Sequence, residues 1–475
     1  MKIPERMLKL LTVGLLCLSM YACGGNSDKE AHSNDANGSA GGGTSGGASG
    51  SDATSSSGNG GSSGNSAGPS GSADSSGSAA LSGSAASSST APASDTTASD
   101  PTGASTQPAS GTTGGSPDSG STGGSGPSSP ENFSIESAEW LDTEVRPVDD
   151  TAVELVAHRA ITLNIGVVAK THTATGRVKV TVRDTNGNTL TDSADDVATG
   201  PASIPLSISS HTALNHYQFP LKAQWIEPGM AVQIDLQIQI GNQFATVATL
   251  NAKPTVGPEQ IMRITVVPFT IAGTTALLPE SKDIKAALMA SWPLSDVIVT
   301  RHAPYQSLLT QPLTSAYESS VGAWGEVLTE LDNLRYNENS MDFYLAFIPK
   351  ENGSGTVGNA DLPLVPHKSS GYARMAAIRA PLLLTSTNWQ KSMMHEMGHT
   401  LNRLHAPCGT TGDPSYPFPT GVVGDASSPW GYDNRSGTWY DPTTTYDVMS
   451  YCAPSWVSWW SYEQTHSFVD RHPLN

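Results

Sequence analysis

Apolar and polar residues alternate over three segments in the middle of the chain, and such alternation is typical of β-strands that bury one face. These segments are residues 161–165, 178–182 and 232–238. Asn186-Gly187 follows the second segment and favours a tight hairpin turn, and Pro228-Gly229 favours another turn just before the third. The pattern predicts an all-β domain of sandwich type over residues 132–260.

After residue 261 the pattern changes, because apolar strands begin to alternate with segments of helical spacing. Strands are predicted over residues 263–269, 297–299 and 343–348, and helices over residues 281–292, 324–336 and 388–402. The third strand is apolar throughout, which is typical of a strand covered on both faces. This order predicts an α/β domain over residues 261–475.

The N-terminal part of the chain predicts export rather than a folded domain. Residues 1–23 combine early basic residues with a short apolar run, and they end in Ala22-Cys23, which resembles the lipobox of bacterial lipoproteins. A lipobox implies that Cys23 is lipidated; an ordinary secretory signal is the alternative. Residues 24–131 are almost entirely Ser, Gly, Ala, Thr, Pro and Asp, so they cannot bury enough apolar surface to fold and are predicted to be a disordered linker.

Net charge and hydropathy limit the kinds of partner that the protein is expected to bind. The net charge is −18, and no cluster of Lys or Arg follows the signal, which argues against nucleic-acid binding. No later segment is long and apolar enough to span a bilayer, so membrane association is expected through a lipid anchor only. These features predict an outer-membrane lipoprotein or cell-surface protein, and they leave open whether cleavage of the linker releases it.

The segment from His395 to His399 reads His-Glu-Met-Gly-His and carries the candidate chemistry. Two histidines four residues apart lie on one face of a helix, so both imidazoles can reach one metal ion. Glu396 follows the first histidine and can act as the general base toward water activated by the metal. A metal site with its own base is therefore predicted.

A third histidine follows after six residues, at His405. It can reach the same metal only if the helix ends and the chain turns back, and Asn402 stands where that end is needed. Asn tolerates a left-handed helix terminus better than any residue except Gly. Three histidines leave one position of a tetrahedral zinc open, so we predict one catalytic Zn²⁺. Glu463 is an alternative third ligand, which the offset of His405 disfavours.

Two cysteines, Cys408 and Cys452, lie beyond the linker. In an exported protein the simplest prediction is a disulfide between them. The alternative, that they bind zinc, is disfavoured because three histidines already suffice for an open catalytic site.

The segment 446–452, about 40 residues after His405, reads Tyr-Asp-Val-Met-Ser-Tyr-Cys. With the extended histidine motif it resembles the Met-turn of metzincin metalloproteases, in which a methionine lies beneath the three imidazoles; Met449 takes that place. The stretches 405–409, 429–433 and 456–458 resemble bacterial exported StcE-like mucin-degrading metallopeptidases. One departure is Asn402, where the metzincin pattern has Gly.

This resemblance covers most of residues 132–475 and implies a zinc endopeptidase with an accessory β domain ahead of the catalytic domain. It makes Tyr451 a candidate for oxyanion stabilisation, because some metzincins use a tyrosine two residues after the methionine. The predicted function is cleavage of extracellular proteins, glycoproteins included, with Glu396 as general base. The alternatives are an adhesin that binds glycoproteins without cleaving them and a zinc hydrolase of non-peptide amides. Calcium binding is left open at four acidic residues: Asp413, Asp425, Asp433 and Asp441.

Overall fold

In a computed structural model, the described residues are 130–474, except residue 153 and the segments 194–195, 315–316, 318–321, 350–355, 364–373 and 382–387. The predicted signal peptide with Cys23, and the predicted linker up to residue 129, lie outside the described residues. Within the described part of the chain, no helix is long and apolar enough to cross a bilayer.

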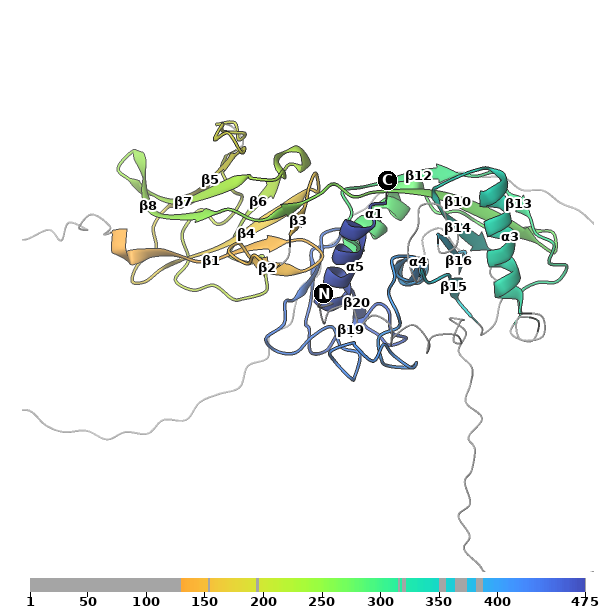
Figure 1. Ribbon diagram of the computed structural model, residues 1–475. Helices are drawn as coiled ribbons and strands as arrows, with labels where there is room; N and C mark the ends of the chain where they lie inside the picture. The colour runs from red at the N-terminus through yellow and green to blue at the C-terminus, as the bar shows by residue number, and fades with distance from the viewer. Residues whose placement is uncertain are drawn as a thin grey trace, which may run out of the picture. The chain divides into compact units, whose positions relative to one another are not determined.

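Residues 130–257 form two antiparallel sheets around a common apolar core (Figure 1). One sheet has the order β2-β1-β4-β6, and the other has the order β5-β7-β8. The strand bounds are β1 Phe133–Leu141, β2 Val145–Pro147, β4 Ile161–Ala169, β5 Gly176–Arg183, β6 Tyr217–Leu221, β7 Ala231–Ile240 and β8 Gln243–Ala252. A short parallel pair, β3 Leu155–Val156 and β9 Val256–Gly257, and the 3-10 turns Pro130–Asn132 and Ala223–Trp225 complete this part.

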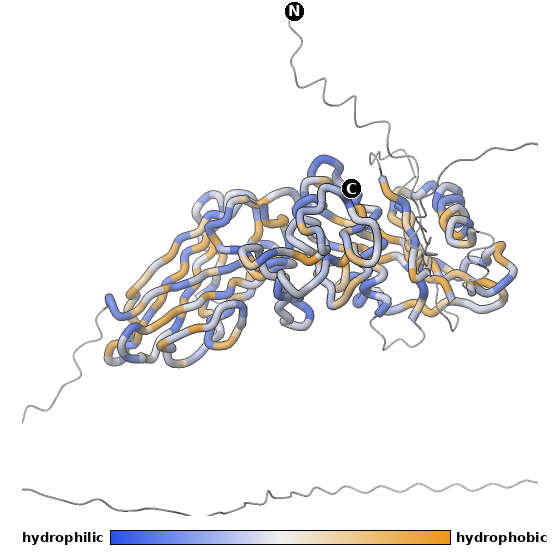
Figure 2. The backbone as a smooth tube through the Cα atoms, turned by 90° about the horizontal axis from the view of Figure 1, so that it is seen from below, coloured by the Kyte–Doolittle hydropathy of each residue, from blue (hydrophilic) through white to orange (hydrophobic). Residues whose placement is uncertain are grey.

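The alternation in the sequence matches the burial of these strands. In β5, Val178, Val180 and Val182 are fully buried and the residues between them are partly exposed. Figure 2 shows the same alternation of apolar and polar residues along the backbone. Both predicted turns are present, because Gly187 and Gly229 adopt the left-handed backbone with φ of 83° and 87°.

The C-terminal part, from residue 258 onward, is built on a seven-stranded sheet with the path β11-β10-β14-β16-β15. The strands β12 and β13 also pair with β10. The bounds are β10 Ile261–Ile271, β11 Thr274–Thr275, β12 Asp296–Arg301, β13 Tyr305–Gln306, β14 Phe343–Ile348, β15 Gly358–Ala360 and β16 Met375–Arg379. β14 is parallel to β10 and β16, whereas β15 runs antiparallel to β16.

Helices cover both faces of this sheet. The helices α1 (Ser281–Ser291) and α4 (Asn388–Thr400) share one apolar core with alternate residues of β14, and α3 (Ala323–Asn337) shares a second core with the remaining residues of that strand. All six residues of β14 are buried, which confirms that this strand is covered on both faces.

The chain beyond α4 holds little regular structure. It contains four short strands and one helix: β17 Gly431–Asp433, β18 Thr438–Tyr440, β19 Tyr446–Asp447, β20 Ser455–Trp456 and α5 Trp459–Arg471. The long irregular segment after α4 folds back onto the core that α1 and α4 share. Over all the described residues, β structure predominates and helices are few.

Candidate metal centre

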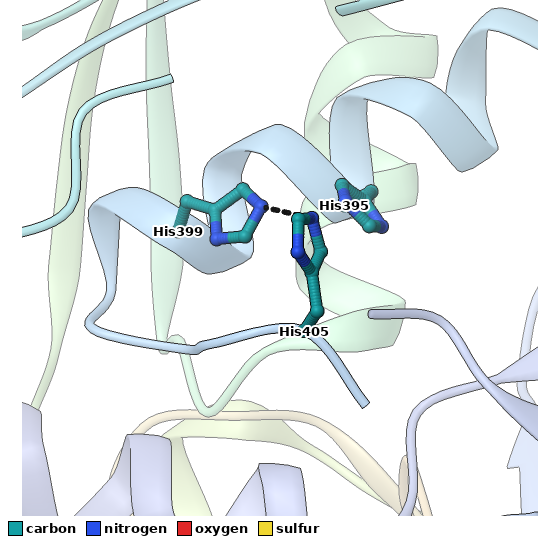
Figure 3. Close-up of side chains that lie close together, drawn as sticks. All are labelled: His395, His399 and His405. Atoms are coloured by element: carbon teal, nitrogen blue, oxygen red, sulfur yellow. Dashed lines mark hydrogen bonds between the residues drawn. The ribbon is translucent and has the colours of Figure 1, made fainter. Parts of the chain in front are cut away.

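Helix α4 presents two imidazoles from one of its faces. Its apolar residues Trp389, Met393 and Met397 pack into the core, which fixes the rotation of the helix. His395 and His399, four residues apart, lie with their ring centroids 4.9 Å apart (Figure 3). Both residues are largely buried, with 6% and 7% of their surface exposed.

The helix ends where the sequence predicts. The amide of Asn402 donates to the carbonyl of His399 at 2.8 Å, and the amide of Arg403 donates to the carbonyl of Gly398 at 2.9 Å. Together with a φ of 65° at Asn402, these two bonds form a Schellman terminus with Asn in the left-handed position. The chain reverses after this turn, and the reversal brings His405 back to the helix.

The three histidines converge on one point. Their candidate ligand atoms all lie within 4.8 Å of one another, and Nε2 of His405 lies 3.2 Å from Nε2 of His399 (Figure 3). Nδ1 of His395 lies 2.8 Å from the carbonyl of Val448, and Nδ1 of His399 lies 2.6 Å from that of Arg403. A proton on each Nδ1 donates to its carbonyl and places the lone pair on Nε2, so these residues fit a bound metal ion.

Burial also favours the form of histidine that binds metal. It lowers the pKa of His395 to about 3 and that of His405 to about 4. The pKa of His399 lies well below its ordinary value of 6.5, because of burial first and of the two neighbouring imidazoles second. All three rings are therefore uncharged at neutral pH, and only the uncharged ring offers a lone pair to a metal.

Met449 lies directly against the histidine helix. Its side chain is fully buried, and a Cβ added to Gly398 would lie 2.5 Å from its sulfur. The turn that carries it is held by the buried carboxylate of Asp447, which accepts from the amides of Met449 at 2.7 Å and Ser458 at 3.0 Å. Sequence reasoning missed Gly398 and Asp447, although an Asp two residues before the methionine is a signal for such a turn.

The predicted disulfide is present. Cys408 and Cys452 are bonded, with their Cα atoms 5.9 Å apart, so they do not serve as metal ligands. Two backbone bonds of 3.1 Å run beside the disulfide, from the amide of Ala406 to the carbonyl of Met449 and from the amide of Tyr451 to the carbonyl of Cys408. The segment with the third histidine is thus fastened to the segment with the methionine.

The two remaining candidate groups also lie at this site. The Tyr451 hydroxyl lies 3.4 Å from Nε2 of His405, and the residue is 38% exposed. The side chain of Glu396 is 1% exposed and contacts the edge strand β15 at Gly358, a residue that sequence reasoning did not single out. No periodicity or motif marks that glycine.

Other acidic candidates are engaged elsewhere. Glu463 in α5 forms an ion pair with Arg146 at 2.6 Å. The four aspartates considered for calcium accept hydrogen bonds within their own turns: Asp413, Asp425, Asp433 and Asp441. Among the described residues, the three histidines form the one group of metal-ligating side chains that could hold an ion.

Comparison with known protein families shows to which family the chain belongs. The family model Peptidase M66 matches residues 209–454, just over half of the 475 residues, and the match includes all three histidines, Glu396 and Met449. The chain belongs to the Peptidase M66 family. Membership indicates a metallopeptidase, which implies protein substrates and a metal ion, and the histidine triad could hold such an ion. The match begins inside the region that the sequence predicts as an accessory β domain.

Other comparisons add little. No curated protein is significantly similar to the chain. Among solved structures, the β-glucuronidase of Parabacteroides merdae is 9% identical, over 56% of this chain and 33% of that enzyme, with a TM-score of 0.17. The matched part thus spans about a third of that enzyme's length, and a likeness this weak carries no argument about fold or activity.

Proposed function

We propose that this protein is a zinc-dependent endopeptidase of the metzincin type that cleaves extracellular proteins. The observation that carries the proposal is the convergence of His395, His399 and His405 beside the buried Glu396 in a Peptidase M66 chain. Three imidazoles leave a tetrahedral zinc one open position, which is the arrangement of catalytic zinc sites. Residues 132–260 are the accessory region in this proposal, and residues 261–475 are the catalytic region.

Each group of the site has one task. A zinc ion held by His395, His399 and His405 would polarise the scissile carbonyl and lower the pKa of water. Glu396 takes a proton from the attacking water and delivers it to the amine of the departing peptide. Met449 supports the histidine helix from below, through its contact with Gly398. The Tyr451 hydroxyl lies next to His405, and it donates a hydrogen bond to the oxyanion that forms at the carbonyl.

The finer parts of the proposal rest on the sequence. Glycoprotein substrates follow from the resemblance to mucin-degrading peptidases. Export, with a lipid anchor at Cys23 that places the protein at the outer membrane or cell surface, follows from the N-terminal pattern. Incorporation of labelled fatty acid, compared between the native chain and a Cys23→Ala chain, tests the anchor.

Cleavage of a protein panel tests the proposed activity. The full chain is incubated with casein and with an O-glycosylated mucin, with and without a zinc chelator. We expect cleavage that the chelator abolishes and added zinc restores, because the open metal position is needed for reaction. Binding of mucin with one zinc ion per chain and no cleavage would instead support the adhesin, whereas cleavage of cell-wall amides alone would support the non-peptide hydrolase.

The variant Tyr451→Phe tests the oxyanion role. We expect kcat to fall by roughly 100-fold with zinc still bound, because the change removes one hydrogen-bond donor from the transition state. Steady-state kinetics and metal analysis measure both effects. Tyr440→Phe is the matched control, since that tyrosine stacks on Trp456 instead, with ring centroids 4.7 Å apart. Wild-type kcat in Tyr451→Phe would assign this ring to packing alone.

A further inference from the structure

The edge strand β15 passes directly over the carboxylate of Glu396. A Cβ built on Gly358 would lie 2.4 Å from Oε1 of Glu396, 2.6 Å from its Cγ and 2.8 Å from its Cδ. Carbon atoms of real side chains do not approach other heavy atoms this closely, so position 358 has no room for any side chain while Glu396 keeps its place.

The backbone conformation does not require glycine at this position. Gly358 is not among the described glycines with a positive φ, and it pairs with Ile378 in a regular antiparallel register. Any residue could adopt this backbone. The need for glycine is therefore steric, and it comes from Glu396.

Neither the strand nor the helix can withdraw easily. On both sides of Gly358 the chain is hydrogen-bonded to β16 and its flanks, through Arg379 N to Val357 O at 3.0 Å and Asp361 N to Met375 O at 3.1 Å. Helix α4 belongs to the main apolar core. An added methyl group at position 358 would therefore displace the side chain of Glu396 rather than the backbone.

We infer that Gly358 is a positioning residue for Glu396: its bare backbone touches the carboxylate and holds it where the base is needed. The steric contact stands on the geometry alone, and only the consequence for turnover rests on the proposed function.

A double-mutant cycle on thermal stability tests the contact. We expect Gly358→Ala to lower Tm by about 5 °C, because overpacking a tight site strains both partners. In the Glu396→Ala background the same change should cost little, since the three clashing atoms are gone. Gly325→Ala on α3 is the matched control, because a Cβ there meets no atom within 4 Å. It should leave Tm equal or slightly higher in both backgrounds.

Each outcome decides the inference. Equal Tm losses in both backgrounds would overturn it, since the strain would then come from another neighbour. If Gly358→Ala fails to fold, recovery of folding in the double variant supports the contact, and failure of both variants overturns it.

Kinetics separate the inference from the proposed function. In the full chain, Gly358→Ala should lose about 100-fold in kcat with KM and zinc content unchanged, because misplacing a reacting group by about 1 Å costs that much. Stability coupling without loss of kcat would leave Gly358 a packing contact and overturn its positioning role. If instead Glu396→Ala itself retains full activity, the proposed base is wrong while the measured steric coupling stands.

Discussion

Replacing Glu396 with Gln is expected to lower kcat by about 1,000-fold while the protein stays folded and keeps its metal. General acid–base catalysis contributes between about 100-fold and 10,000-fold to such reactions, and an amide cannot accept the proton of the attacking water. Gln has nearly the shape of Glu, so the contact with Gly358 and the packing of α4 are preserved. The histidines keep their positions, and one zinc ion per chain should remain bound.

The measurement combines peptide-cleavage kinetics with metal analysis of the same preparation. Glu330→Gln is the matched control, because Glu330 is also buried, at 6% exposure, but lies on α3 and accepts hydrogen bonds from Ser307 and Leu308. That control should keep wild-type kcat and metal content. Activity in Glu396→Gln above a tenth of the wild-type value would remove Glu396 as the general base. Loss of metal in Glu396→Gln would show that this side chain also supports the ligands.

Removing the disulfide with Cys408→Ser and Cys452→Ser is expected to lower the free energy of unfolding by about 4 kcal/mol. The bond closes a loop with a sequence separation of 44, and the loss follows from the chain entropy released when such a loop opens. The same change should weaken zinc binding, because His405 lies three residues before Cys408 and loses part of its attachment to the helix. His395 and His399 stay on α4, so binding should weaken rather than vanish.

Denaturant unfolding measures the first effect, and competition with a coloured zinc chelator measures the second. A reducing agent should shift the wild-type protein to the behaviour of the double variant and leave the double variant itself unchanged. Zinc affinity equal to that of the wild type would mean that the backbone bonds of Ala406 and Tyr451 hold the third histidine without the disulfide.

The elements of the fold were largely predictable from the sequence, because their signals are local. Alternation predicted β4, β5 and β7, and apolar spacing predicted α1, α3 and α4, each within a few residues of its observed bounds. Pairing was not predictable. The antiparallel direction of β15 and its place at the edge of the sheet depend on contacts with β16, and three residues without periodicity give no signal of either.

The metal site also has a part that was predictable from the sequence and a part that was not. Two histidines four residues apart share a helix face by the geometry of the helix itself. Asn402 ends that helix through backbone hydrogen bonds within six residues. Sequence alone was therefore sufficient to predict the convergence of the triad. Met449 against Gly398, and Gly358 against Glu396, are contacts between segments separated by about 40 residues or more. Only the packed core places such segments together, because close packing, and not any local preference of the chain, decides which atoms touch.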